Sequence, residues 1–181
     1  MTVRRFILTL LLNLVAAWPA AVLAQADGPK EYEVKAAFIY HFIQFTEWPA
    51  GSFANKQSPI VLATVGRDPF GGALEQICAG KSISGRVLVV KHFTSAADVK
   101  PCQVLFIAAS SDGEMSGALK SAGSEGLLTV GETDRFVASG GIVRFYAENN
   151  RVRFEINQEA AERAHLRISA KLLRLAKPHG S

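Results

Sequence analysis

The chain has 181 residues, of which 49% are hydrophobic and 20% are charged, so its composition is that of a folded protein and not of a disordered one. Lysine and arginine outnumber aspartate and glutamate by 20 to 16. Arg4 and Arg5 lie in the N-terminal segment, and without them 18 basic residues face 16 acidic ones, a net charge of only +2. This nearly balanced charge does not indicate nucleic acid as a partner.

Residues 1–24 are predicted to be a secretory signal peptide. Arg4 and Arg5 form a positive start, residues 6–17 form an apolar middle, and small residues follow. The apolar stretch is shorter than the roughly 20 residues of a transmembrane helix, and no later segment is apolar for long enough to span a membrane. We therefore expect residues 25–181 to form one domain that is exported to the periplasm, with no membrane-spanning segment.

An amphipathic helix is predicted within residues 31–49. Val34, Phe38 and Phe42 recur at helical spacing, and Pro49 marks the end of the pattern. Further apolar residues lie on a second side of this helix. We therefore expect it to be buried from two directions.

The next elements are predicted to alternate between strands and helices. Strands are expected at residues 60–65, 87–90, 102–108 and 127–130, and helices at residues 69–78 and 112–122. The second and third of these strands are continuous apolar runs, as expected for inner strands that are covered on both faces. Asp68 is positioned to cap the first helix, with Pro69 at its first position, and Asp112 to cap the second.

The C-terminal part is predicted to form a hairpin and a helix. Residues 142–148 and 151–156 alternate apolar with polar side chains, and Asn149-Asn150 supplies a two-residue turn with positive φ. Residues 158–176 have a helical pattern with a basic face, although Ser169 is also positioned to cap a new helix after a bend. The predicted fold is thus a single α/β layered domain, with a central, mostly parallel sheet flanked by helices and a C-terminal antiparallel β-hairpin.

Two cysteines are present, Cys78 and Cys102. In an oxidising compartment such a pair is expected to form one disulfide bond, which would stabilise the fold by about 3–4 kcal/mol. The alternative is a redox-active or metal-binding pair. Because the Cys-x-x-Cys spacing is absent and no histidine is near in sequence, the structural disulfide is the preferred interpretation.

The sequence carries no familiar enzyme motif. The Gly-x-Ser-x-Gly elbow, the phosphate-binding loop and the His-Glu-x-x-His pair are absent, so no catalytic residue, metal or cofactor is expected. The loop after the first strand contains Gly66, Arg67, Asp68 and Phe70, at a position where layered α/β folds bind anions and nucleotides. An ordinary strand–helix turn is the preferred alternative, because Gly-x-Gly-x-x-Gly is missing and Asp68 would repel an anion.

Several segments resemble the YfiR-like family of periplasmic proteins. The matching segments are residues 35–49 (KAAFIYHFIQFTEWP), 65–71, 102–107, 140–143 with 153–157, and 168–176. They span nearly the whole chain after the signal peptide, and Cys78 stands where the family often carries the partner of Cys102. The best-known members carry a second cysteine pair later in the chain, and this sequence lacks it.

The resemblance implies an exported regulator without enzymatic activity. The founding member represses a membrane-bound diguanylate cyclase by contacting its periplasmic sensory domain, which lowers cyclic di-GMP and biofilm formation, and other members accompany sensor kinases. The resemblance also implies a homodimer. We expect the partner to bind the hairpin and the terminal helix, through Phe145, Tyr146, Arg153, Phe154 and Glu155. The alternative is a periplasmic small-ligand-binding protein that uses residues 66–70.

Overall fold

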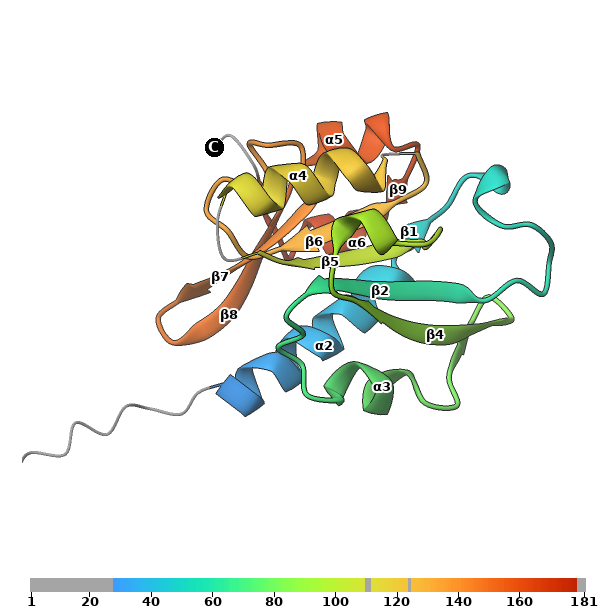
Figure 1. The fold of residues 1–181 in the computed structure, drawn as a ribbon, viewed down its shortest axis with the longest axis horizontal. Helices are drawn as coiled ribbons and strands as arrows, with labels where there is room; N and C mark the ends of the chain where they lie inside the picture. Colours follow the sequence, from blue (N-terminus) through green and yellow to red (C-terminus); the bar gives the residue numbers. More distant parts are fainter. Residues whose placement is uncertain (1–27, 110–111, 124, 179–181) are drawn as a thin grey trace, which may run out of the picture.

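The computed structural model describes residues 28–109, 112–123 and 125–178 (Figure 1). The predicted signal peptide, residues 1–24, lies outside the described residues. Within the described ranges, no helix combines the length and the apolar character that crossing a membrane requires.

An eight-stranded sheet forms the centre of the fold, with the strand order β10-β8-β7-β6-β5-β2-β4-β3. The strands are β2 (Ile60–Gly66), β3 (Ser82–Ile83), β4 (Arg86–Phe93), β5 (Val104–Ala108), β6 (Leu128–Gly131), β7 (Val143–Glu148), β8 (Arg151–Ile156) and β10 (Lys177–Pro178). The neighbours from β4 to β7 are parallel, as are β8 and β10, whereas the β7–β8 and β3–β4 pairs are antiparallel. The predicted α/β fold with a mostly parallel sheet and a hairpin is confirmed.

Helices cover both faces of this sheet (Figure 1). The helical segments are α2 (Gly28–Gln44), η1 (Ala50–Ser52), α3 (Ala73–Cys78), η2 (Ala96–Asp98), α4 (Asp112–Ala122), α5 (Gln158–Arg163) and α6 (Ala170–Leu173). Helices α2 and α3 lie on one face, and α4 lies on the other. A separate two-stranded sheet pairs β1 (Thr46–Glu47) with β9 (Arg167–Ile168).

The alternation of side chains along the central strands produces two hydrophobic cores. In β5, Val104 and Phe106 pack into the core beneath α2 and α3, while Leu105 and Ile107 pack into the core beneath α4. All four are at most 3% exposed. A strand with both faces buried in this way requires a continuous apolar run, which explains the run seen in the sequence.

Helix α2 packs through aromatic side chains against the C-terminal hairpin. Phe42 is fully buried, and its ring contacts those of Phe145 and Phe154 at centroid distances of 5.6 and 4.9 Å. The predicted burial does not extend to Val34, which is 45% exposed. The helix also ends at Gln44, earlier than Pro49, because the following residues leave it to pair with β9.

Helix α3 begins later than predicted. It starts at Ala73, and no side chain caps it. The preceding residue, Gly72, adopts a left-handed conformation with a φ of +92°. Asp68 instead caps the preceding turn, where its Oδ1 accepts a hydrogen bond from the backbone N–H of Phe70 at 3.2 Å.

The predicted continuous helix over residues 158–176 is wrong, and the alternative, in which Ser169 caps a new helix after a bend, is confirmed. Helix α5 ends before His165, which has a φ of +56°, and Ser169 then accepts a hydrogen bond from the backbone of Lys171 at the start of α6. Between the two helices, Ile168 pairs with Thr46 in the small sheet. The basic side chains of this segment therefore do not share one helix face.

Candidate functional site

The predicted disulfide bond between Cys78 and Cys102 is absent, and both cysteines are free thiols. Cys78, at the end of α3, belongs to the core beneath α2 and α3, whereas Cys102 packs against the core beneath α4. The central sheet therefore lies between the two thiols. Burial raises the pKa of each thiol to about 11, so both are protonated at neutral pH.

The predicted ligand loop, residues 66–70, follows β2 at the point where the strand order reverses. Strand β4 lies on one side of β2 and β5 on the other, and all three are parallel. In open α/β sheets, ligands bind beyond the carboxyl ends of the strands at this kind of switch point. The loop thus occupies the position at which such sheets commonly bind ligands.

A pocket of about 880 Å³ opens between this loop and α4. Gly66 and Arg67 line it from the end of β2 and the loop that follows, Ala108 and Ala109 from the end of β5 and the residue after it, and Gly117 from α4. The other lining residues are Val65, Thr94, Ala96, Ile107, Glu114, Ala118 and Ser121. Two of the four predicted loop residues therefore reach a cavity.

The other two loop residues turn to the opposite face of the sheet. Phe70 is buried in the core beneath α2 and α3, and its ring meets those of Phe106 and Tyr32 at 4.7 and 5.3 Å. Asp68 lies beside His92, with its Oδ2 3.8 Å from the Nδ1 of the ring. Gly66 and Arg67 therefore line the pocket, whereas Asp68 and Phe70 lie on the other face of the sheet.

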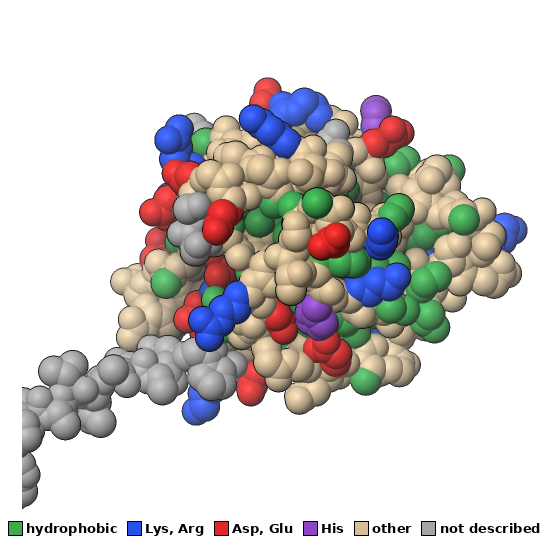
Figure 2. Space-filling view, viewed as in Figure 1, with side chains coloured by type: hydrophobic (Ala, Val, Ile, Leu, Met, Phe, Trp, Pro, Cys, Tyr) green, Lys and Arg blue, Asp and Glu red, His purple; other side chains and the backbone are tan. Residues whose placement is uncertain are grey.

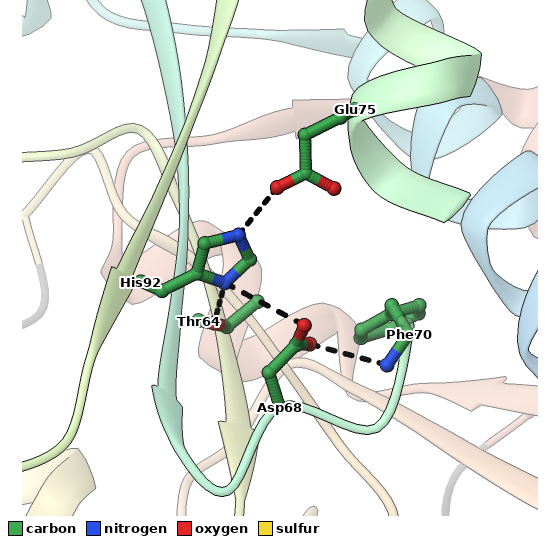
Figure 3. Close-up of polar contacts among 5 residues, drawn as sticks. All are labelled: Thr64, Asp68, Phe70, Glu75 and His92. Carbon is green, nitrogen blue, oxygen red and sulfur yellow. Dashed lines mark hydrogen bonds and ion pairs between the residues drawn. The ribbon is translucent and has the colours of Figure 1, made fainter. Parts of the chain in front are cut away.

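His92 is the centre of a polar cluster that the sequence did not indicate (Figure 3). Its Nδ1 lies 2.7 Å from the hydroxyl of Thr64 on β2, and its Nε2 lies 2.5 Å from the carboxylate of Glu75 on α3. The three residues lie on three elements and are 11 to 28 positions apart in sequence. Only the parallel register of β2 and β4, which pairs Thr64 with His92, brings them together.

This cluster links strands β2 and β4 to helix α3. Thr64 is completely buried, so a substrate has no access to its hydroxyl. Burial acts to raise the pKa of the Glu75 carboxyl, but the hydrogen bond from His92 opposes it, and the net pKa is lowered. The charged carboxylate therefore helps to hold α3 against β2 and β4. Within the described residues, no group of three histidine, cysteine or acidic side chains is arranged to hold a metal ion.

The predicted partner-binding residues lie on both faces of the hairpin. Phe145 and Phe154 are 1% and 3% exposed and face α2. Tyr146 and Arg153 are cross-strand neighbours on the opposite face, where Arg153 is exposed and Tyr146 is partly so. Burial, followed by nearby acidic side chains, raises the pKa of the Tyr146 hydroxyl.

Glu155 also lies on the outer face of the hairpin but is held in an ion pair. Its Oε1 accepts a hydrogen bond from Nε of Arg144, its cross-strand neighbour, at 2.5 Å. The two side chains are only 9% and 16% exposed, and Arg144 also binds Asp134 at 2.9 Å. Arg144 thus joins the two strands at the base of the hairpin and links them to Asp134 in the loop after β6.

The tip of the hairpin extends beyond the sheet (Figure 1). Strand β6 pairs with β7 only as far as Arg144, and β10 pairs with β8 only at Glu155 and Ile156. Beside the tip, a groove of about 480 Å³ lies between α2 and the hairpin. It is lined by Lys30, Glu31, Val34, Phe38, Ala147, Asn150, Arg151 and Val152.

Comparison with solved structures supports the fold. A conserved domain protein from Vibrio cholerae O1 biovar eltor str. N16961 is similar with a TM-score of 0.52 and 14% sequence identity. The match covers 81% of this chain but only 59% of that one, so the chain spans less than two thirds of its length. No curated protein matches this chain.

The sequence resemblance is borne out at the level of the family. Residues 32–177 match the family DUF4154, which is described as YfiR/HmsC-like. The match begins in α2 and ends in β10, so it includes both cores, the hairpin and the loop after β2. This chain belongs to the YfiR/HmsC-like family.

Proposed function

We propose that this chain is an exported regulator that binds the periplasmic sensory domain of an inner-membrane signalling protein and catalyses no reaction of its own. The proposed target is a diguanylate cyclase, which the regulator represses, or a sensor kinase. Family membership supports a regulatory role. The observation that carries the proposal of a binding surface is the β7–β8 hairpin, whose tip extends beyond its neighbouring strands.

An extended hairpin tip offers two recognition features at once. Residues 145–148 and 151–154 have no paired neighbour strand on their outer edges among the described strands, so their backbone groups are available for strand addition. The adjacent groove offers the half-exposed side chain of Val34 as an apolar contact. A partner that binds both features in only one of its states is held in that state.

The five predicted contact residues then have two roles. Tyr146 and Arg153 lie on the outer face and contact the partner directly. Phe145, Phe154 and Glu155 are buried and fix the position of the hairpin relative to α2 and the loop after β6. Alanine substitution of the first group is expected to weaken binding without unfolding, whereas substitution of the second group is expected to destabilise the protein.

The test is crosslinking of the tagged protein in intact cells. Mass spectrometry of the recovered protein then identifies the membrane partner that it retains. Val34→Asp and Tyr146→Ala are expected to abolish retention, and deletion of the gene is expected to raise cyclic di-GMP. Val87→Asp is the matched control, because Val87 is a similarly exposed valine on β4, at 56%. The proposal would be contradicted if no membrane partner were retained and cyclic di-GMP stayed unchanged. It would also be contradicted if Val87→Asp lost retention to the same extent as Val34→Asp and Tyr146→Ala.

A homodimer is also proposed on the basis of the family. Light scattering during size-exclusion chromatography is expected to give twice the mass of the processed chain. A mass equal to one chain at micromolar concentration would contradict this.

A second candidate function, binding of a small ligand, is favoured by the pocket at the switch point. Only Gly66 and Arg67 of the predicted ligand loop line it. This function is compatible with a regulator, because a regulator requires an input.

A further inference from the structure

We propose that the pocket between α4 and the carboxyl ends of β2 and β5 binds a small organic monoanion, namely a carboxylate with an apolar body. This site is separate from the hairpin surface and does not depend on the proposed membrane partner. Its volume of about 880 Å³ lies within the range of roughly 300–1,000 Å³ that is typical of small-molecule sites.

The walls of the pocket suit an apolar ligand body. Most of its lining residues are alanine, glycine, valine or isoleucine. In Figure 2, hydrophobic side chains gather on the visible face below α4. Small side chains keep the cavity open, since an alanine or glycine at these positions leaves the backbone as the wall. Thr94 and Ser121 add hydroxyl groups that can orient a polar substituent.

Arg67 supplies the positive charge at the mouth of the pocket. It is exposed, and among the described residues it forms no ion pair or hydrogen bond, so its guanidinium is not neutralised within the fold. A planar guanidinium matches a carboxylate with two parallel hydrogen bonds. The combination of an apolar wall and one cation at the rim therefore selects an amphipathic anion.

The charges around the pocket favour one negative charge over two. Arg67 is the only basic residue among the described lining residues, and the carboxylate of Glu114 lines the same pocket. Glu114 repels any anion in this pocket, but it repels a phosphate dianion about twice as strongly as a monocarboxylate, because the repulsion scales with the charge of the ligand. A monocarboxylate needs only the single cation that is present.

The geometry of β2 and β5 makes the site rigid. A Cβ atom built on Gly66 would lie 2.4 Å from the carbonyl oxygen of Ala108, so the two strand ends are in direct backbone contact. Both residues line the pocket. Its floor is therefore fixed before a ligand arrives, which lowers the ordering cost of binding.

The first experiment measures binding of phenylacetate and decanoate to the processed full-length protein, by calorimetry and by NMR chemical-shift changes. We expect saturable binding with shifts at residues of β2, β5 and α4. Phenylacetamide and inorganic phosphate are expected to bind at least tenfold more weakly, because the first lacks the charge and the second carries too much. Arg67→Ala is expected to weaken carboxylate binding by tenfold or more, whereas Arg174→Ala, an exposed arginine beyond α6, is expected to have no effect.

A second pair of variants tests the cavity without disturbing the fold. A Cβ atom on Gly117 would meet no atom within 4 Å, so Gly117→Ala adds its methyl group without a clash, and Gly117→Leu extends a larger side chain from the same position on α4. Helix propensity predicts an unchanged or higher Tm for both variants. Gly117→Leu is expected to abolish binding, and Gly117→Ala is expected to retain it.

Three results would overturn the inference. The first is that neither phenylacetate nor decanoate shows saturable binding. The second is that carboxylate binding is unchanged in both Gly117→Leu and Arg67→Ala. The third is that phosphate binds as tightly as the carboxylates. Val34→Asp is expected to leave carboxylate binding unchanged, which separates failure of this site from failure of the partner surface.

Discussion

Gly66 at the end of β2 lies against the carbonyl oxygen of Ala108 at the end of β5, with only 2.4 Å between that oxygen and the position of a Cβ atom on Gly66. The φ of +95° at Gly66 is also one that other residues rarely adopt. Two independent constraints therefore require glycine at the point where the chain leaves the sheet and enters the pocket loop.

Gly66→Ala is expected to destabilise the protein by about 3 kcal/mol or more, because the methyl group adds a backbone clash to the strain of a positive φ. Gly140→Ala is the matched control: Gly140 has a φ of +97° but no atom within 4 Å of its Cβ position, so it reports the strain alone. Urea unfolding of both variants measures the difference. Equal losses of stability would contradict the close approach of β2 and β5.

The thiols of Cys78 and Cys102 are expected to be free in the purified protein and to react slowly with Ellman's reagent while it is folded. Burial raises both thiol pKa values from 9.0 to about 11, so the reactive thiolate is scarce until the pH approaches 11. In urea without reductant, two thiols per chain should react. Finding none in urea would mean that a disulfide bond forms despite the sheet between the two residues.

Arg144→Ala is expected to destabilise the protein by about 2–4 kcal/mol, because it leaves the nearly buried carboxylate of Glu155 without its partner. Arg153→Ala breaks a 3.7 Å ion pair with Glu148, in which both side chains are about half exposed, and should cost less than about 1 kcal/mol. Urea unfolding again provides the measurement. A similar cost for the two variants would argue against a buried pair at the base of the hairpin.

The interaction of Glu75 with His92 predicts a dependence of stability on pH. The pKa of the Glu75 carboxyl is lowered in the folded protein, so its contribution is present above the unfolded value of about 4.5 and is lost as the pH falls below it. Because Glu75 is 47% exposed, solvent screening limits the contribution to about 1 kcal/mol or less. The contribution disappears as the pH falls through the lowered folded pKa, so Glu75→Gln should lower the free energy of unfolding by more at pH 7 than at pH 3.5.

The control for this experiment is Glu162→Gln on α5, an exposed carboxylate outside any ion pair between described residues. It should leave the pH profile unchanged. A deficit of the Glu75→Gln variant that is the same at both pH values would mean that charge does not contribute to the link between α3 and β4.

Local patterns identified most of the strands and the hairpin turn. The apolar run around Phe106 predicted an inner strand, because only a strand covered on both faces has no polar position. Asn149 and Asn150 predicted the turn between β7 and β8, and both residues have the positive φ that such a turn needs. These features depend on neighbours in sequence, so the sequence sufficed for them.

Other predictions failed where a distant segment decided the outcome. The C-terminal helical pattern is interrupted because Ile168 pairs with Thr46, which is more than 100 residues earlier. The polar cluster around His92 was missed because Glu75 comes from α3 and Thr64 from the neighbouring strand. A parallel register is not encoded in any short motif, so no local signal was available to find this cluster.

The sequence by itself thus determined the α/β class, the order of the central strands and helices along the chain, and the YfiR/HmsC-like family, since each follows from local periodicity or from distributed similarity. Only the tertiary structure decided that Cys78 and Cys102 lie on opposite faces of the sheet, and that the loop at Gly66 opens into a pocket on one face only. The physical reason is that the order and register of the strands bring distant residues together or separate them, and spacing along the chain does not specify either.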